Sequence, residues 1–123
     1  MLNVALWICQ IILSVLFAYS GITKSLKSKK ELVELGQSAV EDLPLGLVRF
    51  IGIVEILGVI GIIFPYLAGI FPILTPLAAV GLGIIMILAA IVHYQRGELK
   101  VVPVNLFLLL LSVFVAYGRF ANP

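Results

Sequence analysis

A single acidic residue interrupts the second long apolar stretch of the sequence. Glu55 stands within Gly52-Ile53-Val54-Glu55-Ile56-Leu57-Gly58, about ten residues after this stretch begins and therefore near mid-depth if the stretch crosses a bilayer. A carboxylate there costs on the order of 2.5–3.5 kcal/mol, so it must be protonated, paired with a cation or wetted by an internal cavity. The flanking glycines would let a neighbouring backbone approach closely. Glu55 is therefore the first candidate functional residue.

Two basic side chains on other apolar stretches could reach Glu55. Lys24 ends the first stretch and His93 ends the third, each one to two helical turns nearer the interface. Arg49 lies six residues before Glu55, about 240° round a helix, and is a poor direct partner. We expect Lys24, Glu55 and His93 to line one polar pocket open to the cytoplasmic side. The alternative is that the two cations reach the headgroups separately while Glu55 hydrogen-bonds to a neighbouring helix.

Small and polar residues recur at helical spacing in three of the apolar stretches. The three sets are Gln10, Ser14, Phe17, Gly21 and Lys24; Ala79, Gly83, Met86, Ala90 and His93; and Asn105, Leu109, Ser112, Ala116 and Arg119. Spacings of three and four place each set on one helix face. Because helices in lipid associate through small residues and interhelical hydrogen bonds, these faces are predicted to point inward. Gln10 and Asn105 thereby join the candidates for the pocket.

No pattern of catalytic or metal-binding residues is present in the sequence. One histidine and one cysteine on different stretches cannot build a zinc or haem site alone, so no metal is expected. Cys9 lies inside an apolar run, which favours an inert buried thiol over a redox role. The glycines do not form a phosphate-binding loop. A formal charge of +2 does not favour nucleic-acid binding, and no catalytic residue is assigned.

The elements that must position these residues follow from composition. The chain has 123 residues, of which 63% are hydrophobic and 11% charged, so a soluble domain of this size could not bury its aliphatic side chains. Four apolar stretches of about the length needed to cross the hydrocarbon core occur at about 3–24, 45–64, 75–94 and 103–119. The sequence predicts an all-α membrane protein, a single domain over 1–123 that forms a four-transmembrane-helix bundle.

The connections between the stretches carry their own signals. Ser28 and Glu31 fit a capping box, which predicts a short amphipathic interfacial helix at about 29–40, with a solvated linker as the alternative. Residues 65–72, bounded by two prolines, are expected to connect the second and third helices. The first stretch lacks a preceding basic residue and is about 20 residues long, so it is expected to be a retained helix rather than a signal peptide.

Orientation follows from the basic residues that flank the stretches. Seven of the eight lie on one side or just inside it: Lys24, Lys27, Lys29, Lys30, Arg49, Arg96 and Lys100. Arg119 alone lies on the other side. Because basic residues remain cytoplasmic, both termini are predicted to face away from the cytoplasm.

Three short motifs resemble the DoxX-like membrane proteins. They are Gly21-Ile22-Thr23-Lys24, Gly52-Ile53-Val54-Glu55 and His93-Tyr94-Gln95-Arg96-Gly97-Glu98, with Pro-Val-Asn opening the fourth helix. The resemblance spans nearly the whole chain and implies a compact four-helix bundle in the bacterial inner membrane. The wider group includes small subunits of thiosulfate:quinone oxidoreductase. It also includes an animal chaperone for nicotinic receptor assembly, with a similar Lys, Glu and His arrangement.

Two function classes remain open from the sequence. In the first, a quinone, lipid or other amphiphile binds in the polar pocket, and the protein is accessory to a redox process with a larger membrane or redox protein as partner. In the second, the protein is a scaffold or assembly factor whose polar core is structural. Transport is less favoured, since four helices would need a homodimer to enclose a pathway. Whether the protein is an enzyme is left open.

Overall fold

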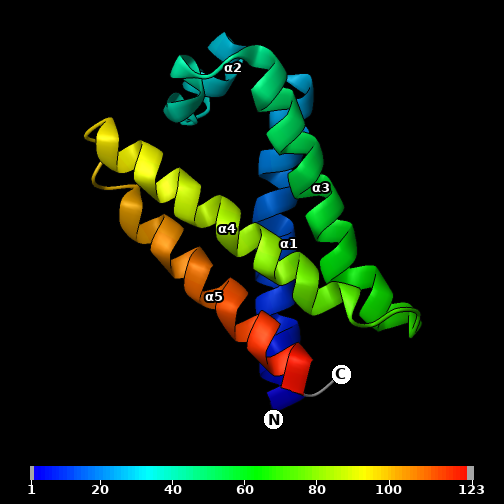
Figure 1. The fold of residues 1–123 in the computed structure, drawn as a ribbon. Coiled ribbons are helices and arrows are strands. Elements are labelled where there is room, and N and C mark those ends of the chain that lie inside the picture. Colours follow the sequence, from blue (N-terminus) through cyan, green and yellow to red (C-terminus); the bar gives the residue numbers. More distant parts are fainter. Residues whose placement is uncertain (1, 122–123) are drawn as a thin grey trace.

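Four long helices form the bundle, joined by one structured connection and two short ones. The computed structural model describes residues 2–121 (Figure 1). The long helices are α1 (Leu2–Leu26), α3 (Leu45–Ala68), α4 (Leu74–Gln95) and α5 (Val102–Ala121). Each is long and apolar enough to cross a membrane. The four-helix fold predicted from the sequence is confirmed.

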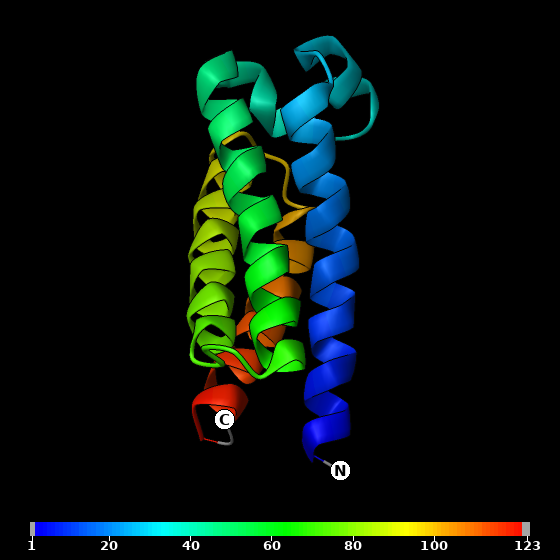
Figure 2. The same cartoon turned by 90° about the vertical axis from the view of Figure 1, so that its right-hand side faces the viewer.

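Successive long helices run in opposite directions. The helix α1 begins and α5 ends at the same end of the bundle, while the connection between α1 and α3 covers the other end (Figure 1). The closest pairings are α1 with α3 and α4 with α5, and α3 also packs on α4 (Figure 2). The helix faces predicted to point inward do point inward. The buried members of the three sets include Gln10, Phe17, Ala79 and Ser112. The outward faces remain aliphatic, as expected of surfaces in contact with lipid.

The connection between α1 and α3 is less helical than predicted. The helix α2 covers only Lys29–Glu34, and the capping box is present, with Ser28 accepting from the Glu31 backbone N–H. Gly36 then adopts φ of +93°, which ends the helix, and a 3₁₀ turn, η1 (Ser38–Asp42), follows. The prediction of one helix over 29–40 was therefore wrong in extent. Leu32 and Val40 fold the connection onto Val48 of α3, forming a small separate core.

The helix α3 continues through Pro65, where the sequence predicted a connection. Proline lacks an N–H, so the carbonyl of Gly61, four residues earlier, loses its helical donor. The Thr75 hydroxyl of α4 lies 3.0 Å from this carbonyl oxygen and donates to it. The Gln10 amide of α1 donates to the next carbonyl, that of Ile62, at 2.7 Å. Neighbouring helices thus stabilise the backbone around the proline, and α3 ends instead at Ala68, followed by Gly69 with φ of +70°.

Candidate functional site

A close helix crossing brings the two central site residues together. The helices α1 and α3 meet at Gly21 and Gly52, where a Cβ on Gly52 would lie 2.8 Å from the carbonyl oxygen of Gly21. Lys24 and Glu55 each follow one of these glycines by three residues. Side chains on a helix lean toward its N-terminus, so on two antiparallel helices these two lean toward each other. The backbone geometry therefore directs the ammonium and the carboxylate to the same point.

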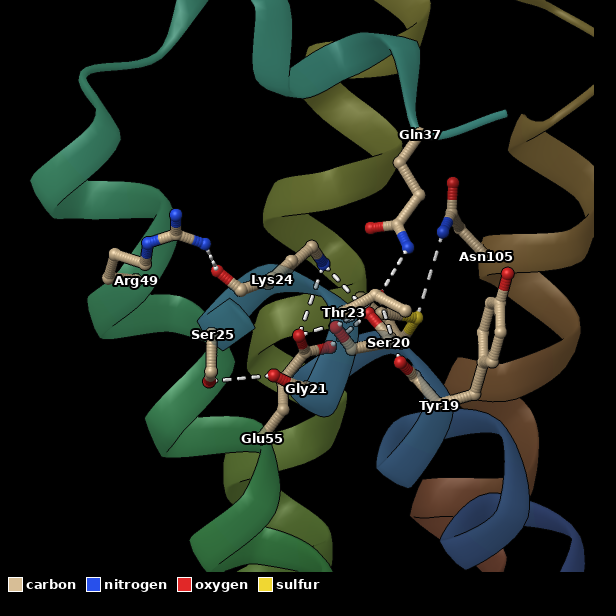
Figure 3. Close-up of polar contacts among 11 residues, drawn as sticks. Tyr19, Ser20, Gly21, Thr23, Lys24, Ser25, Gln37, Arg49, Glu55 and Asn105 are labelled. Atoms are coloured by element: carbon tan, nitrogen blue, oxygen red, sulfur yellow. Dashed lines mark hydrogen bonds and ion pairs between the residues drawn. The ribbon is translucent and has the colours of Figure 1, made fainter. Parts of the chain in front are cut away.

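Lys24 and Glu55 form an ion pair inside the bundle (Figure 3). The Lys24 Nζ lies 3.1 Å from Glu55 Oε1, and the side chain of Glu55 is only 1% exposed. Ser20 completes the group: its hydroxyl accepts from Lys24 Nζ at 2.9 Å and lies 3.1 and 3.2 Å from the two carboxylate oxygens. Sequence reasoning missed Ser20, although its position four residues before Lys24 places both on one helix face.

Arg49 does not pair with Glu55, in agreement with the prediction from helical geometry. Its guanidinium donates to the backbone carbonyls of Lys24, at 2.8 Å, and Lys27. These carbonyls lie at the end of α1, where the helix lacks further N–H donors. Arg49 therefore anchors the end of α1 that carries the ion pair.

The ion pair lies in the wall of a cavity of about 600 Å³. All four long helices and the connection between α1 and α3 contribute to it. Most of the lining is aliphatic or aromatic, and the polar side chains in it include Ser20, Lys24, Gln37, Glu55, His93 and Asn105. Four of the five residues proposed from the sequence, Lys24, Glu55, His93 and Asn105, thus line one cavity. Such a cavity suits a mainly apolar ligand with a polar head.

His93 lines this cavity, but its hydrogen-bond partner is Glu98 rather than Glu55. The His93 Nδ1 lies 2.9 Å from Glu98 Oε1, and Arg96 Nε contacts the same oxygen at 3.2 Å. The other carboxylate oxygen of Glu98 accepts from the Ser38 hydroxyl, and Arg96 also pairs with Asp42. We call this group of five residues the clasp: Ser38, Asp42, His93, Arg96 and Glu98. Because Ser38 and Asp42 belong to η1, the clasp attaches the connection between α1 and α3 to the end of α4 and the segment that follows it.

The clasp changes the acidity of its central carboxylate. The hydroxyl of Ser38 first, then the hydrogen bond from His93 and the interactions with Arg96, hold the pKa of Glu98 below its ordinary value. Burial works in the opposite direction but does not outweigh these contacts. Hydrogen bonds to a charged carboxylate stabilise the charged form, so Glu98 remains an anion over a wider pH range than a free glutamate.

Gln10 lies outside the cavity, contrary to its inclusion among the pocket candidates. Its side-chain oxygen accepts from Arg119 Nε at 2.7 Å, near the end of the bundle opposite to the clasp. The Arg119 guanidinium is buried, donates to Asn3 at 2.9 Å and stacks 3.9 Å from the Tyr66 ring centroid. Trp7 also faces the guanidinium, at 5.6 Å. Helical spacing correctly placed Gln10 on the inner face of α1 but did not give its depth.

No cluster of metal ligands occurs in the described residues 2–121: no three His, Cys, Asp or Glu side chains there are placed to hold a metal ion. The polar groups of the cavity lining are instead an ion pair, the hydroxyls of Tyr19 and Ser20, an imidazole and two amides. These groups bind oxygen and nitrogen atoms of organic ligands through hydrogen bonds.

A bundle of four membrane-length helices with a buried ion pair defines a small multi-pass membrane protein. The chain belongs to the DoxX-like family, which matches residues 8–115. This confirms the resemblance inferred from the three motifs. No curated protein and no solved structure shows a significant match to the chain.

Proposed function

We propose that this protein binds one amphiphilic small molecule, a quinone or another lipid-like compound, between its membrane helices. The observation that carries this proposal is the cavity of about 600 Å³, with apolar walls and the Lys24–Glu55 pair on one side. Cavities of about 300–1,000 Å³ with a few convergent polar groups are typical of small-molecule sites. The apolar chain of the ligand would occupy the aliphatic part, and its head would lie near the ion pair.

The ion pair retains capacity for a ligand. Among the described residues, the three N–H donors of Lys24 have two hydrogen-bond partners, Ser20 and Glu55, so one donor is left for an oxygen atom of a ligand head. A carboxylate beside that ammonium can take up or return a proton. These properties fit an accessory of a redox process, in which a larger membrane or redox protein supplies the electrons. The residues of this chain would bind the ligand and take up or return its proton.

We also infer that the clasp end faces the cytoplasm of a bacterial cell and that the bundle lies in the inner membrane. The support is the excess of Lys and Arg at that end, at Lys24, Lys27, Lys29, Lys30, Arg49, Arg96 and Lys100. With this orientation the polar side of the cavity lies toward the cytoplasm. Cysteine accessibility at Lys30 and at Tyr66, in single-cysteine variants, would test the orientation.

Two adjacent alanines of α4 allow a matched test of the cavity. Ala89 lines the cavity and Ala90 does not. Ala89→Leu should fill part of the space, whereas Ala90→Leu adds the same volume elsewhere. We expect mass spectrometry of organic extracts to find an amphiphile bound to the purified wild-type protein and to Ala90→Leu in near-stoichiometric amounts. The same compound should be reduced several-fold in Ala89→Leu.

The contrary result is equally specific. If Ala89→Leu folds normally and keeps the wild-type amount of every extracted compound, the cavity does not bind the ligand. Copurification of a larger membrane protein that survives Ala89→Leu but is lost on changing outward helix faces would instead favour the scaffold. Elution volume in size-exclusion chromatography and thermal unfolding provide the folding control for both variants.

A further inference from the structure

Two buried oxygen atoms in the cavity lining have no hydrogen-bond partner in the described residues. They are Oε1 of Gln37 and Oδ1 of Asn105. Both belong to side-chain amides, and Asn105 is only 7% exposed. Buried polar atoms of this kind are nearly always paired, and leaving one unpaired is costly. Both atoms are acceptors, so what each of them lacks is a donor.

The orientation of the Gln37 amide follows from its contact with Thr23. The Gln37 Nε2 lies 2.9 Å from the Thr23 hydroxyl oxygen. That hydroxyl has one hydrogen, which it donates to the backbone carbonyls of Tyr19 and Ser20, at 2.9 and 3.0 Å. Thr23 can therefore only accept from Gln37, which requires the N–H₂ group of the amide to face it. The carbonyl oxygen of Gln37 must then face away from Thr23 and toward other partners.

The orientation of the Asn105 amide is set by Met86. The Asn105 Nδ2 lies 3.7 Å from the Met86 sulfur, which can accept a weak hydrogen bond but cannot donate one. The carbonyl oxygen of Asn105 therefore points the other way. Gln37 comes from the connection and Asn105 from α5, and both residues line the cavity (Figure 3). Neither oxygen is exposed in this conformation, so a donor on a ligand would reach either one only after the amide rotates.

We propose that the ligand of this cavity carries hydroxyl or N–H donors on its head, and that Gln37 and Asn105 select it. This inference rests on the proposed ligand binding and deepens it. A head with only carbonyl oxygens would leave both of these amide oxygens unpaired. A head with two hydroxyl groups supplies a donor to each amide, and its oxygens can still accept from Lys24. A dihydroxy aromatic compound, such as a hydroquinone, and the diol head of a monoacylglycerol share this chemistry.

A pair of probes, one with and one without hydroxyl donors on the same ring and chain, tests the inference. Decylhydroquinone, kept reduced under argon, and its dimethyl ether have the same ring and chain. We expect the hydroquinone to bind the detergent-purified protein about tenfold more tightly or better, measured by isothermal titration calorimetry. Monoolein, measured in the same way, distinguishes a hydroquinone from a monoacylglycerol. Whichever of decylhydroquinone and monoolein binds more tightly identifies the class of head that the cavity prefers.

Two variants remove the acceptors one at a time. Gln37→Met and Asn105→Leu keep the approximate shape of each side chain, and each should reduce the preference for hydroquinone over its ether several-fold. Two variants are used so that failure of one to fold leaves the test intact. Equal binding of both probes to the wild type would overturn the donor preference while leaving the proposed function standing. Absence of binding by every probe, together with an amphiphile content unchanged in Ala89→Leu, would overturn the proposed function itself.

Discussion

Gly21 and Gly52 oppose each other at the contact between α1 and α3, and a Cβ added to either would lie 2.8 Å from the carbonyl oxygen of the other. A backbone oxygen cannot turn aside as a flexible side chain can. The separation of the two helices therefore depends on both residues being glycine. Since Lys24 and Glu55 pair across the same contact, this crossing also sets the distance between ammonium and carboxylate.

Replacing Gly21 by alanine is expected to destabilise the bundle by roughly 1–3 kcal/mol, because the helices must separate to admit the methyl group. Gly81→Ala is the matched control, since a Cβ there meets nothing within 4 Å on an exposed face of α4. That change should be neutral or stabilise by up to about 1 kcal/mol. Denaturant unfolding in detergent micelles measures both. Equal stability of the two variants would contradict the role assigned to the crossing.

Breaking the ion pair from one side should be more damaging than removing it entirely. Lys24→Met leaves the Glu55 carboxylate buried without its cation, for which we expect a loss of about 3–5 kcal/mol. The double variant Lys24→Met/Glu55→Leu removes both charges and should recover most of that loss. A double-mutant cycle, completed with Glu55→Leu, gives the coupling between the two side chains. Simple additivity of the two single changes would show that the ion pair does not couple α1 to α3.

The hydrogen bond of the Thr75 hydroxyl should contribute to the stability of the bundle only because Pro65 lies in α3. Thr75→Val removes the donor to the Gly61 carbonyl and is expected to cost about 1–3 kcal/mol, whereas Thr75→Ser, which keeps the hydroxyl, should cost less. In a Pro65→Ala background the chain regains an N–H at position 65 that can serve Gly61. There the effect of Thr75→Val should largely disappear. An undiminished effect would assign Thr75 to packing instead of backbone hydrogen bonding.

The clasp should respond to pH only in acid. Because the folded pKa of Glu98 is lowered, its contribution is complete above the ordinary carboxyl pKa of about 4.3 and is lost as pH falls through the lower folded value. The difference in thermal unfolding between wild type and Glu98→Gln should therefore shrink as the pH falls below about 4.3. A difference that grows on acidification would refute this account.

The sequence offers Lys24 and His93 as candidate partners because a lone carboxylate in an apolar helix is costly, but it does not decide between them or exclude separate headgroup contacts. It does not predict that Ser20 and Glu98 belong to the site. Placing either residue at its position costs little free energy, so the sequence gives no signal, and each acquires its role only through contacts in the folded structure. Periodicity assigned Gln10 to the inner face but could not give its depth. Pro65 was mistaken for the end of a helix because local rules for proline cannot include the hydroxyl that Thr75 supplies from α4.

The contacts of Arg119 have a consequence for biosynthesis. Its acceptors, Gln10 and Asn3, belong to α1, which is synthesised before α5, whereas Arg119 lies near the end of α5. Until α5 packs against α1, the Arg119 guanidinium lacks these acceptors. A chain in which α1 is misplaced would therefore leave the Arg119 guanidinium of α5 without both of these acceptors.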